Sequence, residues 1–275
     1  MDNGNRRRIL IFRASAARGF TLVELLACVA IIALLGAVLI AAVNGVRTRA
    51  KVAGSLSNLR QMGMAAYTYS ADNDGNLMPH ALFDEDLGQN REWCYGLFQY
   101  GATNQFAEGL LGQYLEDAQD VLTCPLWEPE ESIQTAIENA SAVPGNLGYG
   151  YNGLQLSKKV YESDGSFIGN YLGHSYSVVI KPNRTVMFAI SATPAYSGYA
   201  APQEMIWGPS HQTAGANPIC IRLVNNSETL VCWVDGSVEQ VNAIPVTHFE
   251  KDGIYTGYID ADNDGIADED IWAVQ

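Results

Sequence analysis

Acidic side chains at alternate positions near the C-terminus have the spacing of a cation-binding loop. Residues 260–270 read DADNDGIADED, which places acids at positions 1, 3, 5 and 9 of a twelve-residue calcium loop and Gly265 at position 6. Alternating carboxylates can converge on one hard cation, and the glycine makes the turn between them. The predicted calcium ligands are Asp260, Asp262, Asp264, the carbonyl of Ile266, and Asp268.

Position 12 of this loop departs from the calcium pattern, because Ile271 stands where a bidentate acid belongs. Glu269 or Asp270 would have to replace that ligand. The alternative is a solvated acidic turn that follows a strand at residues 253–259. No Lys or Arg lies within the loop, and mutual repulsion among so many carboxylates favours a bound cation.

The histidines form no recognised catalytic arrangement. The four are His80, His174, His211 and His248. The sequence contains no Gly-x-Ser-x-Gly nucleophile elbow, no His-Glu-x-x-His helix and no phosphate-cradling loop. We therefore expect a protein that is not an enzyme.

The N-terminal part of the chain contains a long apolar segment at residues 20–43. Its one charge is Glu24, and the nineteen residues 25–43 carry none. As a helix, nineteen residues span roughly 30 Å, the thickness of the hydrocarbon core of a bilayer. The sequence therefore predicts a single membrane-spanning helix here.

Three interpretations of this segment differ in what becomes of its N-terminal side. A plain signal anchor would leave the chain uncut. A secretory signal peptide would be cut near Ala41-Ala42, but its apolar region usually runs 7–15 residues, shorter than the run here. The arginines at 6–8 also suggest twin-Arg export, and nothing beyond the arginines supports that route.

The third interpretation is a resemblance carried by residues 18–24, RGFTLVE. This run resembles the processing motif of type IV prepilins and type II secretion pseudopilins. The resemblance implies that a prepilin peptidase cuts a leader of residues 1–19 between Gly19 and Phe20 and methylates the new N-terminus. It also implies a single-pass protein of the inner (cytoplasmic) membrane that later enters a periplasmic or cell-surface filament.

Glu24 is the residue of this motif with a predicted role in assembly. A carboxylate in hydrocarbon costs roughly 2.5–3.5 kcal/mol on insertion scales, so such groups normally pair or mark function. Cleavage would create a free amine on Phe20. The resemblance implies that Glu24 pairs with this amine in a neighbouring subunit, and the alternative is that it lies near the lipid headgroups without a partner.

The charge of the chain argues against nucleic acid as a partner. The whole chain has a formal net charge of −14, and residues 20–275 carry 11 bases and 29 acids, a net charge of −18. Such a surface repels phosphate backbones. The arginines before the span outnumber the nearest bases after it only slightly, so the prepilin motif decides for an exported C-terminal domain.

Residues 44–75 predict an amphipathic continuation of the helix. One face of it repeats at intervals of four and three residues: Val52, Leu56, Leu59, Gly63, Ala66 and Ser70. The run Asp-Asn-Asp-Gly at 72–75, with Pro79 beyond it, predicts the end of the helix. A long helix of this kind packed on a head domain is the pilin architecture.

The head, residues 76–275, reads as short strands and loops. Predicted strands lie at residues 176–180, 185–191, 219–224, 230–235 and 237–241, and predicted short helices at 106–115 and 130–139. Asp235-Gly236 between two strands predicts a hairpin with a type I′ turn. We expect an α+β fold in which the long helix packs on a small antiparallel sheet.

Several head segments resemble one branch of prepilin-like proteins, which carries a His-x9-Asp-Gly motif near the C-terminus. The segments are residues 61–79, Cys124-Pro125, residues 148–153, and His211 with Asp235-Gly236. In this chain 23 residues separate His211 from Asp235, so the match to the branch is partial.

Four of the five cysteines would be exported, where disulfides can form. Cys220 and Cys232 fall on adjacent predicted strands, and a Cys94–Cys124 bond would close a loop of about thirty residues. Four cysteines permit three pairings, so other pairings stay open. Cys28 lies in the apolar segment and is expected to be inert.

Two classes of function follow from these features. The first is a structural subunit that is processed, methylated and assembled into a type IV pilus or a type II secretion pseudopilus. The second is a membrane-anchored binding module whose aromatic residues engage polysaccharide or a surface partner. The aromatic residues considered for that surface are Trp93, Trp207, Trp233, Tyr149 and Tyr151.

Overall fold

A computed structural model describes most of the chain outside its N-terminus and several loops. The described residues are 20–83, 91–94, 96–98, 105–106, 109–127, 148–194, 200–201, 206, 220–224, 227–249, 254–266, 268 and 270–272; within the first helix the side chains at 38, 41, 42 and 44 lie outside the description. The chain divides into two compact units, residues 1–47 and 48–275.

One long helix is followed by short helices and strands. The helical elements are α1 (Leu22–Asp72), η1 (Gly112–Tyr114), α2 (Ala118–Leu122), α4 (Gly153–Leu156) and η2 (Tyr176–Val178). The strands are β1 (Ala81–Phe83), β2 (Arg91–Trp93), β3 (Gly96–Phe98), β4 (Gln105–Phe106), β5 (Tyr149–Tyr151), β6 (Ser157–Tyr161), β7 (Phe167–Gly173), β8 (Val186–Pro194), β9 (Ala200–Ala201), β10 (Cys220–Arg222), β11 (Glu228–Trp233), β12 (Val238–Phe249) and β13 (Ile254–Ile259).

The first unit contains the N-terminal part of α1. Every side chain from residue 20 to residue 35 is exposed, including large apolar ones such as Leu22 and Ile32, which are 80% and 69% exposed. No helix among the described residues is both long enough and apolar enough to cross a membrane.

In the second unit, α1 buries one face along its length. The buried side chains of this face are Ser55, Leu59, Met62, Gly63, Ala65, Ala66, Tyr69 and Ser70. The predicted amphipathic continuation of the helix is therefore confirmed. Gly63 marks the closest approach, because a Cβ atom there would lie 2.8 Å from Sγ of Cys232. Only glycine lets the helix come this near to the sheet.

The predicted end of the helix is also confirmed. Asp74 and Gly75 both adopt left-handed backbone conformations, with φ of 56° and 76°. The amide of Gly75 donates to the carbonyl of Ser70 at 2.8 Å, which is the six-to-one bond of a Schellman cap. An Asx residue and a glycine in series thus end α1 and turn the chain toward the head.

The main sheet is antiparallel and curls until its end strand β10 pairs with β8. Its order is β10-β13-β12-β11-β8-β5, with β9 on β8, and β10 pairs with β8 as well as with β13. The curl encloses an apolar cluster: Val186, Ala189, Ile206, Leu223, Val231, Trp233, Val241, Ala243, Ile259, Ile271 and Trp272. The expected α+β fold with an antiparallel sheet is confirmed.

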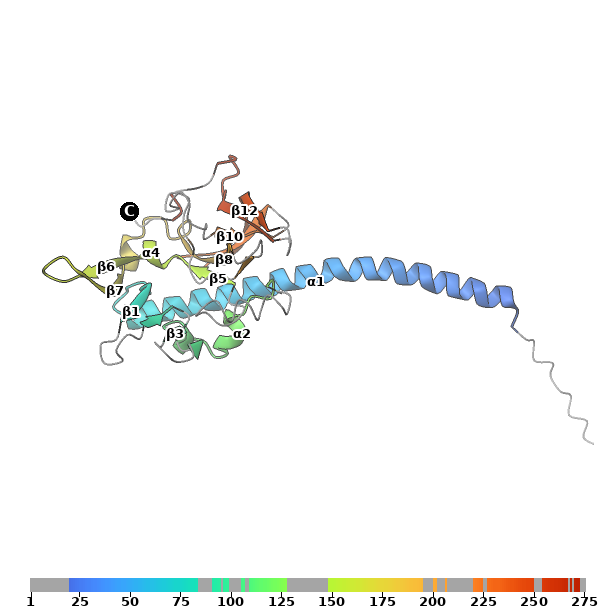
Figure 1. Cartoon of the computed structure of the whole chain (residues 1–275), viewed down its shortest axis with the longest axis horizontal. Coiled ribbons are helices and arrows are strands. Elements are labelled where there is room, and N and C mark those ends of the chain that lie inside the picture. The colour runs from blue at the N-terminus through green and yellow to red at the C-terminus, as the bar shows by residue number, and fades with distance from the viewer. Residues whose placement is uncertain are drawn as a thin grey trace, which may run out of the picture. The chain divides into compact units, whose positions relative to one another are not determined.

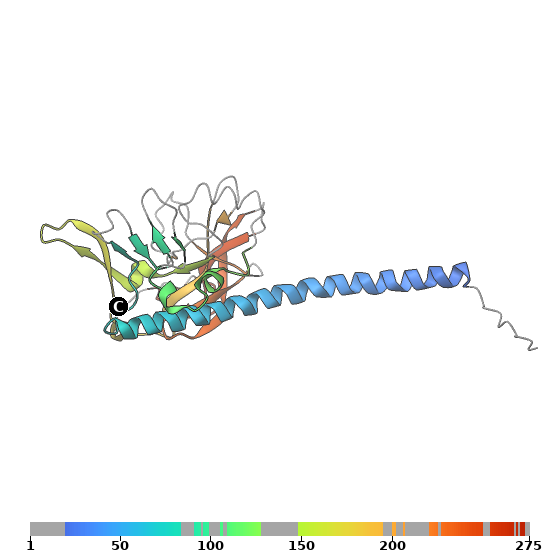
Figure 2. The same cartoon turned by 90° about the horizontal axis from the view of Figure 1, so that it is seen from below.

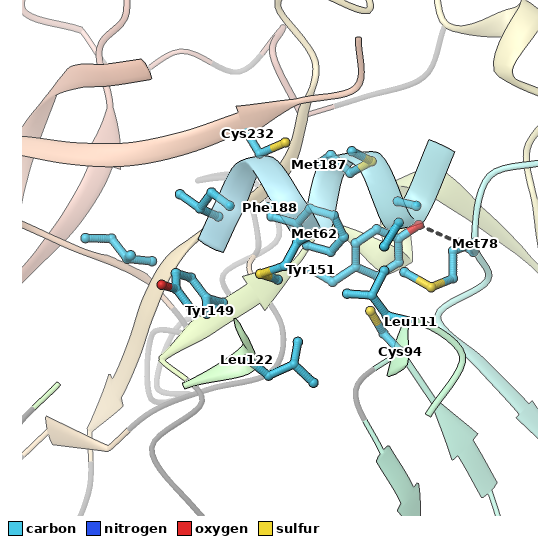
Figure 3. Close-up of a cluster of buried hydrophobic side chains, with 14 of the residues drawn as sticks. Met62, Met78, Cys94, Leu111, Leu122, Tyr149, Tyr151, Met187, Phe188 and Cys232 are labelled. Carbon is cyan, nitrogen blue, oxygen red and sulfur yellow. Dashed lines mark hydrogen bonds between the residues drawn. The ribbon is translucent and has the colours of Figure 1, made fainter. Parts of the chain in front are cut away.

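The opposite face of β8 and β11 packs against α1. Side chains alternate along β11, so that Val231 and Trp233 lie inside the curl while Leu230 and Cys232 join the cluster around the helix. Figures 1 and 2 show β5 and β8 running beside the C-terminal half of α1. Figure 3 shows Met62 of α1 among Tyr149, Tyr151 and Phe188 of these strands.

Two smaller sheets complete the described head, and neither was predicted. Strands β1 to β4 form a four-stranded sheet, and β6 and β7 form a separate hairpin. The hydroxyl of Tyr151 donates to the carbonyl of Met78 and ties the segment before β1 to the core, as the dashed line in Figure 3 shows. Strands β1 to β4 have only two or three residues each, too few to give a clear alternating pattern in the sequence.

The hairpin at Asp235-Gly236 is confirmed, but its turn type was predicted wrongly. Only Gly236 has positive φ, at 82°, whereas a type I′ turn needs two such residues. Gly236 donates to the carbonyl of Trp233 and Trp233 donates to that of Ser237, both at 2.9 Å. This is a type I turn followed by a left-handed glycine, with Asp235 accepting from the amide of Ser237.

Two further element predictions are wrong. The predicted strand at residues 176–180 is instead the short helix η2 (Tyr176–Val178) and its cap, because the amide of Tyr176 donates to the carbonyl of Gly75 just beyond α1. Residues 106–115 contain the end of β4 and the single turn η1 in place of a helix. The helix predicted at 130–139 lies outside the described residues.

Gly63 gives a direct test of this packing. We expect Gly63→Val to lower the free energy of unfolding by about 1–3 kcal/mol, because the new side chain must displace Cys232 in a filled core. Chemical denaturation of the purified chain measures the change. Ala53→Val, at an exposed position of the same helix, is the control and should cost about 0.5 kcal/mol or less. Equal effects of the two substitutions would contradict the close approach at Gly63.

Candidate functional sites

The N-terminal site is built on the first turn of α1. Phe20 is 74% exposed, and Gly19 lies outside the described residues. Thr21 is the N-cap: its hydroxyl accepts from the amide of Glu24 at 3.2 Å. In return, Oε2 of Glu24 accepts from the amide and the hydroxyl of Thr21 at 2.9 and 2.8 Å. This reciprocal pattern is a capping box.

The capping box explains how the sequence begins a helix at this point. A Thr followed three residues later by a Glu satisfies amides that the first turn of a helix leaves without partners. The acid also lies at the positive end of the helix dipole. The described chain therefore enters α1 from an exposed Phe20 through a capped first turn.

Comparison with known protein families gives a match over the same residues. The matching model is described as the prokaryotic N-terminal methylation motif and covers residues 14–40, which include Gly19, Phe20 and Glu24. The chain carries a prokaryotic N-terminal methylation motif. Comparison of the chain with curated proteins and with solved structures gave no match.

The methylation motif is of the prepilin and pseudopilin type, and it points to a structural subunit and away from an enzyme. It does not reach the head, so it gives no support to the branch with the His-x9-Asp-Gly motif. His211 lies outside the described residues. Asp235 and Gly236 are accounted for by the turn between β11 and β12.

The acidic loop follows β13 directly. The structure brings together Asp260, Asp262 and Asp264, whose carboxylates offer ligand atoms within 4.8 Å of one another. Asp260 is buried and anchored by its amide, which donates to the carbonyl of Asn242 on β12. Left-handed conformations at Asn263 and Gly265 turn the chain so that the acids converge.

Asp268 does not join these three acids. Its Oδ2 accepts from the amide of Ala261 at 2.7 Å and closes the base of the loop. Burial raises the pKa of this carboxyl, and the negative charges of Asp262 and Asp270 raise it further, while the hydrogen bond and Arg184 act in the opposite direction.

The fold brings a positive charge to the acidic loop that the loop sequence alone does not show. No base lies within the loop itself, but Lys181 reaches Asp270 from a distant part of the chain at 3.0 Å. Ile266 has a side chain that is 67% exposed. Ile271, at position 12, is fully buried inside the curled sheet, and its carbonyl accepts from the amide of Val186 at 2.8 Å. The residue at position 12 is therefore part of the hydrophobic core and not a calcium ligand.

Sequence reasoning missed the residue that fixes this C-terminal segment. Nδ2 of buried Asn152 donates to the carbonyls of Val186 at 2.9 Å and Trp272 at 3.0 Å. Asn152 thus clamps the last described residues to β8. The segment 148–153 was noted only as a resemblance, and an Asn before a glycine gives no signal of a long-range contact. The missed capping box, in contrast, could have been found from Thr-x-x-Glu at residues 21–24.

The predicted disulfides do not occur among the cysteines whose side chains the structure describes. Cys94, Cys124 and Cys232 form no disulfide bond, and the side chain of Cys220 lies outside the described residues. Cys232 pairs with Phe188 of β8 and Cys220 with Ala192 of the same strand. Four residues along a strand separate these positions by about 13 Å, too far for the side chains to bond. Sγ of Cys124 instead lies 3.7 Å from the hydroxyl of Ser55 on α1.

The predicted aromatic binding surface is also wrong at the residues that the structure describes. Tyr149, Tyr151 and Trp233 are each at most 2% exposed and belong to the core. Nε1 of Trp233 donates to Glu239 at 2.6 Å. The side chain of Trp93 and the whole of Trp207 lie outside the described residues. The structure therefore does not favour a glycan-binding module.

Alkylation tests the state of these cysteines. Burial raises the pKa of Cys232 to about 12, so only about one thiol in 10⁴ is ionised at pH 8. We expect light iodoacetamide to spare Cys124 and Cys232 in the folded chain. Heavy reagent added with denaturant and without reductant should then label both, together with Cys94. Peptide mass spectrometry reads the labels, and a reduced sample is the control. Heavy label that appears only after reduction would contradict the assignment.

Proposed function

We propose that this chain is a prepilin-like structural subunit. A prepilin peptidase removes residues 1–19 after Gly19 and methylates the amine of Phe20. The segment 20–43 anchors the chain in the inner membrane, with residues 76–275 exported. The processed chain then joins other pilin subunits in a type IV pilus or a type II secretion pseudopilus.

The methylation motif is the observation that carries this proposal. Three further features support it. The helix begins at Leu22, two residues after Phe20, so cutting at Gly19 would leave α1 whole. The apolar side chains of residues 20–35 are exposed and need lipid or neighbouring helices to cover them. The anchor itself rests on the sequence, in which residues 25–43 are uncharged.

In this proposal Glu24 selects a neighbouring subunit through charge. Its carboxylate lies one turn into the helix, where hydrocarbon makes an unpaired charge costly. The methylated amine of Phe20 in an adjacent subunit would neutralise it. Thr21 holds Oε2 of Glu24 at the start of the helix, which limits where that amine must arrive.

Mass spectrometry of the N-terminus tests the proposal. The chain should be isolated from the membrane of the cell that makes it. We expect the mature protein to begin at methylated Phe20, because the resemblance of residues 18–24 to prepilin processing motifs implies a cut between Gly19 and Phe20. An intact leader, or a chain that begins near Ala42, would overturn the assignment.

Glu24→Ala separates processing from assembly in the same experiment. Cleavage should stay largely intact, since the residues at the cut are unchanged. The amount in the sheared filament fraction should fall by about tenfold or more, because the amine loses its charged partner. Glu162→Ala, an exposed acid on the β6–β7 hairpin, is the matched control and should leave that amount unchanged.

We further propose that the acidic loop binds a structural calcium ion in the exported head. Asp260, Asp262 and Asp264 would supply carboxylate oxygens, as would the carbonyl of Ile266, and Asp268 would support the base of the loop through Ala261. The cation would relieve the repulsion among these acids. It would also hold the loop that leads into the buried Ile271 and Trp272.

Calcium should therefore stabilise the folded chain. For a dissociation constant on the order of 0.1 mM, typical of extracellular sites, 10 mM calcium adds about 2.7 kcal/mol to the free energy of unfolding. Thermal unfolding with and without calcium measures this gain. Asp264→Asn should abolish most of it, whereas Asp164→Asn, at an exposed turn outside the loop, should retain it. No response of the parent chain to calcium would remove the metal from the proposal.

A further inference from the structure

Charge is strongly segregated along this chain. From residue 25 to residue 71 there is no acid, and the four bases are Arg47, Arg49, Lys51 and Arg60. The head, residues 76–275, contains 7 bases and 26 acids, a net charge of −19. A purely basic helix segment is therefore joined to a strongly acidic head.

Two of these bases lie on the face of α1 that points away from the sheet. Arg49, Arg60, Met64 and Tyr67 follow one another at intervals of 11, 4 and 3 residues, which places them within about 60° of one another around the helix. All four are exposed, Met64 by 66% and Tyr67 by 56%. We call these four residues the open face.

The apolar part of the open face continues onto the neighbouring segment. The ring of Tyr67 packs edge-on against that of Tyr176 at 5.7 Å between centroids. Val178 and Ile180, just beyond, are 41% and 66% exposed. Large apolar side chains gathered on the surface in this way mark sites of interaction.

The cationic part of the open face has its charge available. Arg49 and Arg60 form no ion pair within the described residues. In the head, Lys181 forms an ion pair with Asp270, which shows that acids of the head bind a basic side chain that lies close enough. The open face therefore presents positive charge and apolar surface side by side.

We propose that the open face is the docking surface for the acidic head of a second copy of this chain. The inference rests on the proposed function, because it describes how assembled copies contact one another. Two chains that each carry −18 between residues 20 and 275 repel at close range. Docking of an acidic head on Arg49 and Arg60 turns part of that repulsion into attraction and sets the register between copies.

The length of the open face favours a protein partner over anionic lipid. Eighteen residues separate Arg49 from Tyr67, or about 27 Å along the helix. The headgroup layer on each side of a bilayer is only about 5–8 Å thick. A lipid surface could therefore reach only the end of the face near Arg49, whereas a folded head can cover all of it.

Photo-crosslinking in the filament tests the proposal. A benzophenone amino acid replaces Met64 in the full-length chain, expressed in the cell that makes it. After irradiation of the sheared filament fraction, we expect a covalent dimer of the chain whose cross-linked peptide maps to acidic segments of residues 76–275. Arg60→Glu should lower the dimer yield roughly fivefold or more, since it reverses an interfacial charge. Lys158→Glu, the same charge change on exposed β6, should leave the yield unchanged.

The outcomes separate this inference from the proposed function. If the chain enters filaments but Met64 cross-links to no second copy, or if Arg60→Glu and Lys158→Glu have equal effects, the docking surface is wrong and the subunit assignment stands. If the parent chain is neither processed nor found in filaments, the proposed function fails and the inference fails with it. Cross-links to a different protein only would likewise overturn the docking of a second copy.

Discussion

The burial of one face of α1 against β8 and β11 is the contact on which the head depends. These strands have two apolar faces, one turned into the curled sheet and the other toward the helix. Without α1, fully buried side chains such as Phe188 and Leu230 would face water. Because Gly63 has no side chain, the helix can lie directly against Cys232 of β11. The packing of this face of α1 therefore depends on a glycine at position 63.

The C-terminal segment closes the other side of the sheet. Ile271 and Trp272 fill the curl, the carbonyl of Ile271 extends the hydrogen bonding of β8, and Asn152 holds the carbonyl of Trp272. The acidic loop lies between β13 and this segment. The conformation of the acidic loop therefore sets the position of Ile271 and Trp272 relative to the curled sheet. A surface loop thus influences the packing of the hydrophobic core.

The sequence revealed those features that local patterns encode. The long helix, its terminal Asx-Gly turn, β8, β11, β13 and the hairpin at Gly236 each follow from periodicity or turn residues. Non-local features were missed. The curl depends on β10 pairing with both β8 and β13, and the separation of Cys220 from Cys232 depends on where β10 and β11 meet β8. Neither the strand pairing nor the distance between residues on paired strands can be inferred from spacing along the chain. In the acidic loop the three convergent acids were found, but the folding back of Asp268 was not.

At the N-terminus, the capping box narrows what the partner of Glu24 can be. Thr21 gives its carboxylate two hydrogen bonds, but both donors are neutral and leave the net charge in place. In a medium of low dielectric constant that charge still needs a cation. Arg18 would leave with the leader, and Arg47 lies 23 residues further on, about 34 Å along the helix. If the chain is cut after Gly19 as proposed, the amine of Phe20 would be the cation that the sequence can bring to this depth, and its supply would depend on that cut.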